Sequence, residues 1–194
     1  YMDEKDANDK LTGKRVTTSD YASANYYYVN KSSLPKVYGG FNTSLSWKGF
    51  DLSAIFAYSI GGYIYNRDIT MILHNGSLEG RDWSTEILRR WTPDNRYTDV
   101  PALSTTSNNW NSASTRFLQN NSYMRLKNLT LSYNLPKQWI SKLSLSSVQV
   151  YVQGDNLFTI HRNQGLDPEQ GITGITYYRY PAMRTISGGI NVSF

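Results

Sequence analysis

Two carboxylates stand close together in the stretch GLDPE, at Asp167 and Glu169. A pair of carboxylates can divide the roles of general acid and general base in hydrolysis when their environments separate their pKa values. Here Pro168 lies between them, and proline beside aspartate is typical of a tight turn. The pattern therefore favours a turn with two structural carboxylates over a hydrolytic site.

The other residues that could support chemistry are few. His74 and His161 are the two histidines, they lie far apart in the sequence, and neither has a partner at metal-ligand spacing. Cysteine is absent, which excludes disulfides and thiolate metal sites. We therefore expect no catalytic residue, no metal and no cofactor.

Alternation of apolar and polar residues is the dominant pattern of the chain, and it predicts strands with one apolar face. Lys48 and Gly49 separate the first two alternating segments and predict a tight hairpin turn. In the third segment, residues 125–127 are out of phase, which a β-bulge would absorb. The five predicted strands span residues 37–47, 50–60, 123–134, 148–158 and 185–194.

The connections between these strands are short, long, short and long in turn, with long loops at about 62–121 and 159–184. Strands that all cross one layer would place the short connections on one side and the long ones on the other. Transmembrane β-barrels have this asymmetry, with short periplasmic turns and long extracellular loops. Within the first long loop, residues 82–91 have a helical phase with a possible N-cap at Asp82.

The composition fits the same class of protein. Among 194 residues there are sixteen tyrosines against six phenylalanines, and only 18% of residues are charged. No apolar run is long enough for a transmembrane helix, and the opening ten residues form a charged, loop-like stretch. The net charge of +5 is scattered rather than clustered, which disfavours nucleic-acid binding.

Several ordered segments resemble the C-terminal barrel region of the SusC/RagA-like TonB-dependent transporters of Bacteroidetes outer membranes. The resemblance covers most of the chain from about residue 35 onward. It is carried by ILRRWTPDN (87–95), SYMRLKNLTLSYNLPK (122–137), VQVYVQGDNLFTI (148–160), GLDPE (165–169) and YYRYPAMRTISGGINVSF (177–194).

This resemblance implies an all-β fold in which about five antiparallel strands form the C-terminal part of a large transmembrane β-barrel with long extracellular loops. Residues 1–36 would be an extracellular loop and lead-in, and residues 37–194 the C-terminal strands. Five strands cannot close a barrel, so we expect the plug domain, the TonB box and the signal peptide upstream in a longer transporter. The implied function is active import of oligomeric nutrients, glycan or peptide.

The implied partners are a SusD-like lipoprotein above the loops, the remainder of the transporter, the TonB complex through the missing N-terminal part, the barrel-assembly machinery and outer-membrane lipid. The final strand resembles the signal that the assembly machinery recognises, and Phe194, Trp47 and Phe50 are expected at the periplasmic rim. On this strand the residues expected to face lipid are Ile186, Gly188, Ile190, Val192 and Phe194.

Aromatic residues in the long loops have two interpretations. They either pack the loops into an ordered cap, or they line the mouth of the substrate cavity, where flat rings stack on sugars or peptide side chains. The candidates for substrate or lid contact are Trp83, Trp91, Trp110, Tyr177, Tyr178 and Arg179.

Two other functions would account for part of the pattern. A soluble β-sandwich carbohydrate-binding module would use the same aromatic loops as its binding site. A secreted β-rich hydrolase would need an acid–base pair or a nucleophile triad, and the sequence offers neither.

Overall fold

A computed structural model of the chain describes residues 1–18, 20–76, 78–104, 109–165, 167–169 and 173–194. The chain folds into two compact units. Unit 1 comprises Tyr1–Lys31 and Tyr65–Leu118, and unit 2 comprises Ser32–Ile64 and Gln119–Phe194. No helix among the described residues has the length and apolarity needed to cross a membrane.

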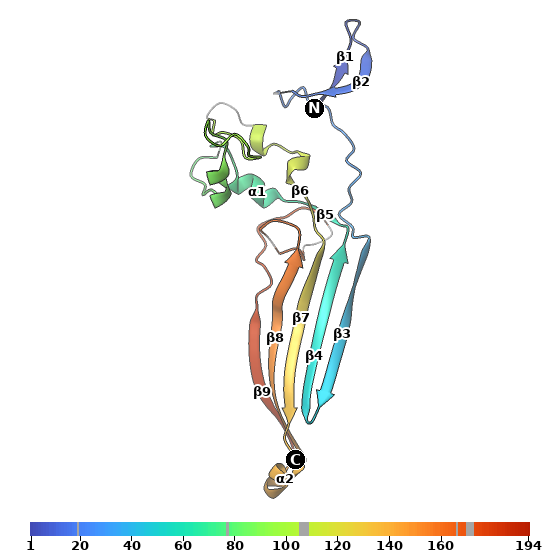
Figure 1. Ribbon diagram of the computed structural model, residues 1–194, viewed down its shortest axis with the longest axis vertical. Coiled ribbons are helices and arrows are strands. Elements are labelled where there is room, and N and C mark those ends of the chain that lie inside the picture. The colour runs from blue at the N-terminus through green and yellow to red at the C-terminus, as the bar shows by residue number, and fades with distance from the viewer. Residues whose placement is uncertain (19, 77, 105–108, 166, 170–172) are drawn as a thin grey trace. The chain divides into compact units, whose positions relative to one another are not determined.

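Unit 2 is built on one antiparallel sheet of five long strands, drawn as arrows in Figure 1. The strands of this sheet follow one another in sequence order, and the first and the last of them are its two edges. This confirms the five strands expected from the alternation. They are β3 (Val37–Trp47), β4 (Phe50–Ile60), β7 (Tyr123–Asn134), β8 (Ser147–His161) and β9 (Thr185–Ser193).

The predicted hairpin turn between β3 and β4 is confirmed. Trp47 pairs directly with Phe50, which leaves Lys48 and Gly49 as a two-residue loop. Both loop residues have positive φ, 48° and 89°. A turn of this kind follows the right-handed twist of the flanking strands, and it favours asparagine followed by glycine.

We predict opposite effects for substitutions at these two turn positions. Gly49→Ala should lower the free energy of unfolding by about 1–2 kcal/mol, because a side chain in the left-handed region costs about that much. Lys48→Asn should raise it slightly, because asparagine tolerates positive φ better than lysine. Urea unfolding of the reconstituted protein measures both. Equal changes of the same sign would contradict the assigned turn.

The predicted bulge lies at Lys127. Against β4, Leu126 and Asn128 pair with the adjacent residues Phe56 and Ile55, so Lys127 is the extra residue. The register against β8 shifts at the same level, where Asn156 and Leu157 lie opposite Lys127. As a result, Leu126 pairs with Phe158 and Leu129 pairs with Gly154, and both leucines lie on the same face of the sheet. The extra residue therefore keeps the apolar face continuous along a strand whose sequence falls out of phase.

Three strand boundaries differ from the sequence prediction. β8 begins at Ser147, one residue before the expected start, because Ser147 pairs with Ser193 of β9. β8 continues to His161, three residues beyond the expected end, because Thr159, Ile160 and His161 still pair with β7. β9 ends at Ser193, which leaves Phe194 outside the strand. The second long connection therefore begins at Arg162.

The connections of unit 2 lie at opposite ends of its sheet. The β3–β4 turn and the β7–β8 connection are at one end, and the segment that joins β8 to β9 is at the other (Figure 1). The β7–β8 connection contains α2 (Lys137–Ile140) and η4 (Ser141–Leu143). Ile140 is buried while Trp139 is exposed.

Unit 1 contains short elements around a small core. Leu73, Ile87 and Val100 form this core, with Ile69 and Trp110 packed against it. The elements of unit 1 are β1 (Met2–Lys5), β2 (Leu11–Val16), α1 (Arg67–Ile72), η1 (Thr85–Arg89), η2 (Asn109–Asn111) and η3 (Thr115–Phe117). The short strands β5 (Tyr63–Tyr65) and β6 (Leu118–Asn120) pair with each other, and most residues of both belong to unit 2.

Two local predictions in unit 1 were wrong. The charged opening stretch contains β1, which pairs with β2. The helical phase of residues 82–91 is only the short 3₁₀ helix η1, and its N-cap is Ser84, whose hydroxyl accepts from the Glu86 N–H at 3.3 Å. A 3₁₀ helix repeats every three residues, so the α-helical spacing of the flanking tryptophans does not align them on one helix face.

Candidate functional site

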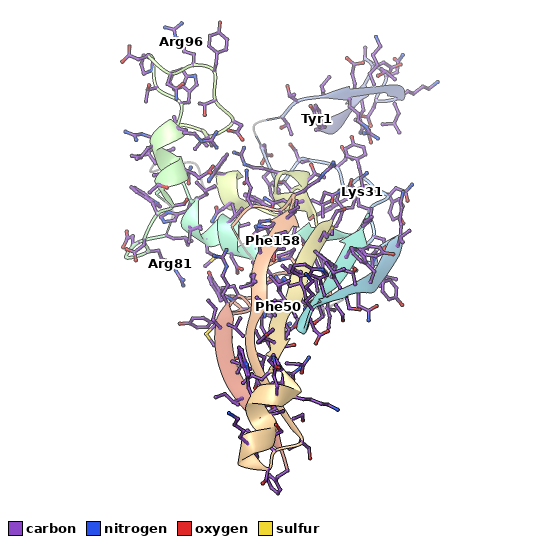
Figure 2. All side chains as sticks on the ribbon, turned by 60° about the horizontal axis from the view of Figure 1, so that its bottom comes forward. Tyr1, Lys31, Phe50, Arg81, Arg96 and Phe158 are labelled. Carbon is purple, nitrogen blue, oxygen red and sulfur yellow. The ribbon has the colours of Figure 1, made fainter. Side chains whose placement is uncertain are left out.

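The sheet of unit 2 has one apolar face that is exposed over much of its length. Apolar residues follow one another across neighbouring strands in register, as in the row Leu45, Leu52, Leu131 and Val152. Each of these four side chains is at least 40% exposed. A continuous exposed apolar surface of this kind marks contact with another protein or with lipid. Figure 2 shows side chains projecting from the sheet, with Phe50 on β4 and Phe158 on β8 labelled.

The opposite face of the sheet is polar and is crossed by side-chain hydrogen bonds between neighbouring strands. Asn134 donates to Asp51 at 2.7 Å, and Asn128 donates to Asp155 at 2.8 Å. Such cross-strand pairs stabilise the register.

At one end of the polar face, Arg125 holds a cluster of ion pairs. Its guanidinium donates to Thr159 Oγ1 at 2.9 Å, to Glu169 Oε2 at 2.8 Å and to Asp167 Oδ1. Lys127 forms a second ion pair with Glu169, at 2.5 Å. The side chains of Arg125 and Asp167 are only 4% and 7% exposed. We call Arg125, Lys127, Asp167 and Glu169 the Arg125 cluster.

The cluster fastens the GLDPE segment to the sheet. Asp167 also accepts from the backbone N–H of Ala182 at 2.7 Å and from that of Glu169 at 2.9 Å. The carboxylates that could have formed an acid–base pair are therefore held by cations and amides. This arrangement agrees with a structural role for both carboxylates, because each is engaged in holding residues 167–169 against the sheet.

The pKa of Asp167 depends on two opposing effects, burial and the hydrogen bonds and positive charge around the carboxylate. Burial by itself would raise this pKa, but hydrogen bonds from Ala182, Arg125 and Glu169 and the charge of Arg125 outweigh burial and hold it below 3.8. The carboxylate is thus stabilised in its ionised form.

We predict that acid releases this segment from the sheet. The pKa of Asp167 is lower in the folded state than in the unfolded state. The cluster therefore makes its full contribution to folding stability at pH values above the unfolded pKa, and this contribution is lost as pH falls through the folded pKa. Pepsin cleavage within residues 162–184 should accelerate as pH drops from about 5 to about 2. The Asp167→Asn variant should lose this dependence, whereas identical pH profiles would contradict the assignment.

A cavity of about 340 Å³ adjoins the cluster within unit 2. Its lining includes Arg125, Asp167, His161 and Arg184. His161, which the sequence suggested as a residue at a strand end, is the last residue of β8, and its Nδ1 lies 2.9 Å from the Asn163 carbonyl oxygen. No group of metal-ligating side chains occurs among the residues that the structure describes.

The aromatic candidates of the first long loop have different environments. Trp110 is largely internal to unit 1: its indole N–H donates to the Leu73 carbonyl, and the Arg116 guanidinium lies 3.4 Å from its ring centroid. Trp83 donates to Nδ1 of the buried His74 at 3.1 Å but is 45% exposed. Trp91 is 43% exposed. Trp83 and Trp91 thus offer ring surface to a partner, whereas Trp110 serves the core.

The candidates of the second long loop belong to unit 2. Tyr177 and Tyr178 are exposed, and Tyr178 has a positive φ of 41°. Arg179 is exposed beside them. On β9, Ile186, Gly188, Ile190 and Val192 lie on the apolar face, opposite Gly154, Val152, Val150 and Val148 of β8, and Phe194 beyond the strand is exposed.

The structure also contains a feature that sequence reasoning missed. A groove of about 650 Å³ in unit 1 is lined by Tyr1, Tyr21, Tyr26, Tyr27 and Tyr65, together with small polar and apolar residues. The run of three tyrosines at 26–28 is the sequence signal that could have indicated it.

Comparison with known proteins gives one consistent result. No family model matches the chain. TonB-dependent receptor P3 of Formosa agariphila is 34% identical over 80% of this chain. TonB-dependent receptor SusC of Bacteroides thetaiotaomicron is 27% identical over 86% of this chain. A chain of the RagAB peptide importer in the closed-closed state superposes with a TM-score of 0.80 and 35% identity, over 98% of this chain.

The matched part is small in each relative. The chain spans 16% of the length of each of the two receptors and 20% of the RagAB chain.

Proposed function

Because the chain belongs to the SusC/RagA-like TonB-dependent transporters, we propose that it supplies part of the barrel wall and the extracellular loops of an importer for oligomeric nutrients. Family membership places the five-stranded sheet in a large β-barrel of the outer membrane, and the chain is not an enzyme. The observation that carries the proposal is a sheet with one exposed row of apolar side chains and long connections at one end.

The two faces of the sheet then have distinct roles. The apolar face contacts lipid, and the polar face, with the Arg125 cluster, lines the lumen. The outer strands β3 and β9 each pair with one neighbour among the described residues. In lipid, further strands of the transporter must cover both edges, because open edges leave backbone groups unsatisfied.

We assign the chain to the C-terminal part of the barrel, with residues 1–36 as an extracellular loop and lead-in and residues 37–194 as the last strands. In this arrangement β9 is the strand that the barrel-assembly machinery engages by edge pairing. Energy comes from the TonB complex through a part of the transporter outside this chain.

The extracellular loops, about 62–121 and 159–184, face a SusD-like lipoprotein that acts as a lid. The RagAB importer, which a matched chain helps to form, supports this partner. Trp83, Trp91, Tyr177, Tyr178 and Arg179 are the exposed side chains proposed to contact the lid or the cargo, and Trp110 positions the first loop from within.

The alternative of a soluble β-sandwich carbohydrate-binding module has little support. A sandwich needs a second sheet against the apolar face. Within the described ranges, the two further sheets are two-stranded and built from short strands.

Import is tested in a deletion strain that lacks the transporter containing this chain. Growth on an oligomeric glycan or peptide as the sole carbon source should be lost, and it should return only when both the transporter and TonB are present. A tagged transporter should also retain its lipoprotein partner during purification in detergent. Unchanged growth on every oligomer tried, together with purification of the transporter alone, would overturn the proposal.

A further inference from the structure

The tyrosine groove of unit 1, lined by the five tyrosines named above, has the dimensions of a ligand site. Its volume of about 650 Å³ falls within the ~300–1,000 Å³ that small-molecule sites occupy. Every lining residue belongs to unit 1, so the groove is formed within a single unit.

Three of the rings are held by contacts with neighbouring residues. The Tyr21 hydroxyl donates to the Ala113 carbonyl at 2.9 Å, and the Tyr27 hydroxyl donates to Asp3 Oδ1 at 2.8 Å. The Arg15 guanidinium also lies 3.8 Å from the centroid of the Tyr27 ring. Tyr65 meets Phe117 edge to face, with the ring centroids 6.2 Å apart.

The two hydroxyl bonds hold the tips of Tyr21 and Tyr27, the Arg15 guanidinium covers one face of the Tyr27 ring, and Phe117 packs against Tyr65. The three rings are therefore positioned before any ligand arrives. Fixed aromatic planes lose little conformational freedom on binding, so stacking on them is efficient. The fourth ring, Tyr26, is 96% exposed and supplies an open face at the groove.

The charge of the lining indicates the chemistry of the ligand. Asp20 is the one charged side chain among the described lining residues, and its Oδ1 already accepts from the Ala22 N–H at 2.9 Å. No lysine or arginine is among the lining residues that the structure describes. An acidic ligand, or the carboxylate end of a peptide, would find no cationic side chain in this lining.

A neutral sugar chain fits this lining. The C–H faces of pyranose rings are flat and apolar and pack on tyrosine rings, while their hydroxyls need small neutral donors and acceptors. Thr18, Asn25, Ser114 and Thr115 supply such groups along the groove.

We propose that the tyrosine groove binds a segment of a neutral oligosaccharide. This inference rests on the proposed function, because it narrows the imported oligomer from glycan or peptide to an uncharged glycan. It also assigns a ligand contact to Thr18 and residues 20–29, which belong to the stretch that the sequence predicted as an extracellular loop and lead-in.

Tyr26→Ala is the decisive variant, and Tyr28→Ala is its matched control. Tyr28 is two residues away and 93% exposed, but it does not line the groove. The intact transporter, purified in detergent, is titrated by calorimetry with neutral hexasaccharides of different linkage, with a uronic-acid oligosaccharide and with an uncharged peptide. At least one neutral hexasaccharide should bind. Tyr26→Ala should lower its affinity about three- to tenfold, which is the contribution of one ring contact, and Tyr28→Ala should leave the affinity unchanged.

The possible outcomes test the binding site, the ligand class and the proposed function separately. Equal affinity of the Tyr26→Ala and Tyr28→Ala variants would contradict the proposed binding site in the groove, but it would not contradict glycan import. Binding of the peptide or of the acidic sugar with the same dependence on Tyr26 would overturn the ligand class. Unchanged growth of the deletion strain on every oligomer tried, with binding intact, would instead overturn the proposed function.

Discussion

Arg125→Met is expected to lower the free energy of unfolding by about 3–5 kcal/mol, the usual cost of removing one partner from a buried ion pair. The guanidinium is 4% exposed and faces Asp167, which is 7% exposed. Methionine keeps much of the length of the side chain but leaves this carboxylate without its cation. Urea unfolding of the reconstituted transporter measures the change.

A second measurement locates the effect of Arg125→Met. The amide of Ala182 donates to Asp167, so its hydrogen exchange should accelerate in the variant if the segment detaches from the sheet. Unchanged exchange at Ala182 would show that the loss of stability arises elsewhere.

Two further variants serve as controls for Arg125. Lys127 contacts the same Glu169, but its side chain is 32% exposed, so Lys127→Ala should cost less than about 1 kcal/mol. The double variant Arg125→Met with Asp167→Asn removes both charges while keeping an acceptor for Ala182, and it should recover most of the loss. Equal effects of Arg125→Met and Lys127→Ala would contradict the buried ion pair.

Val152→Arg is expected to lower the free energy of unfolding by about 2–4 kcal/mol in a bilayer, the cost of an arginine near the middle of a lipid-facing surface. Val152 lies in the middle of β8, pairs with Leu131 and Gly188, and is 48% exposed on the apolar face. Its side chain has no protein layer above it in the described part of the chain, so lipid must solvate the new charge.

The matched control for Val152 is the next residue. Gln153 lies at nearly the same depth on the polar face, where its amide donates to Asp155 at 3.2 Å. Gln153→Arg places its charge toward the lumen and beside a carboxylate, so it should cost less than about 1 kcal/mol. A larger loss for Gln153→Arg than for Val152→Arg would reverse the assignment of the two faces.

The strands could be derived from the sequence because their signal is local. Alternation fixes which face each residue occupies, and even the phase error at residues 125–127 indicated the bulge that the register confirms at Lys127. The turn at Lys48 and Gly49 is equally local, because two adjacent residues determine it.

The short elements of the long loops were harder to derive. At residues 82–91, spacing alone suggested an α-helix, but only a short 3₁₀ helix forms there and Ser84 caps it. Fewer than two helical turns carry too little periodicity to fix either the type or the start of a helix.

The sequence by itself determined the five strands, their order along the chain, the amphipathic character of the sheet and the absence of cysteine chemistry. The tertiary structure alone decided that Arg125 pairs with Asp167, 42 residues further along the chain, and that tyrosines from residues 1–27 share a groove with Tyr65. The physical reason is the separation in sequence between the residues on which each feature depends. Alternation and turns depend on neighbouring residues, whereas a buried ion pair or a groove depends on which distant segments the fold brings within a few ångströms of each other.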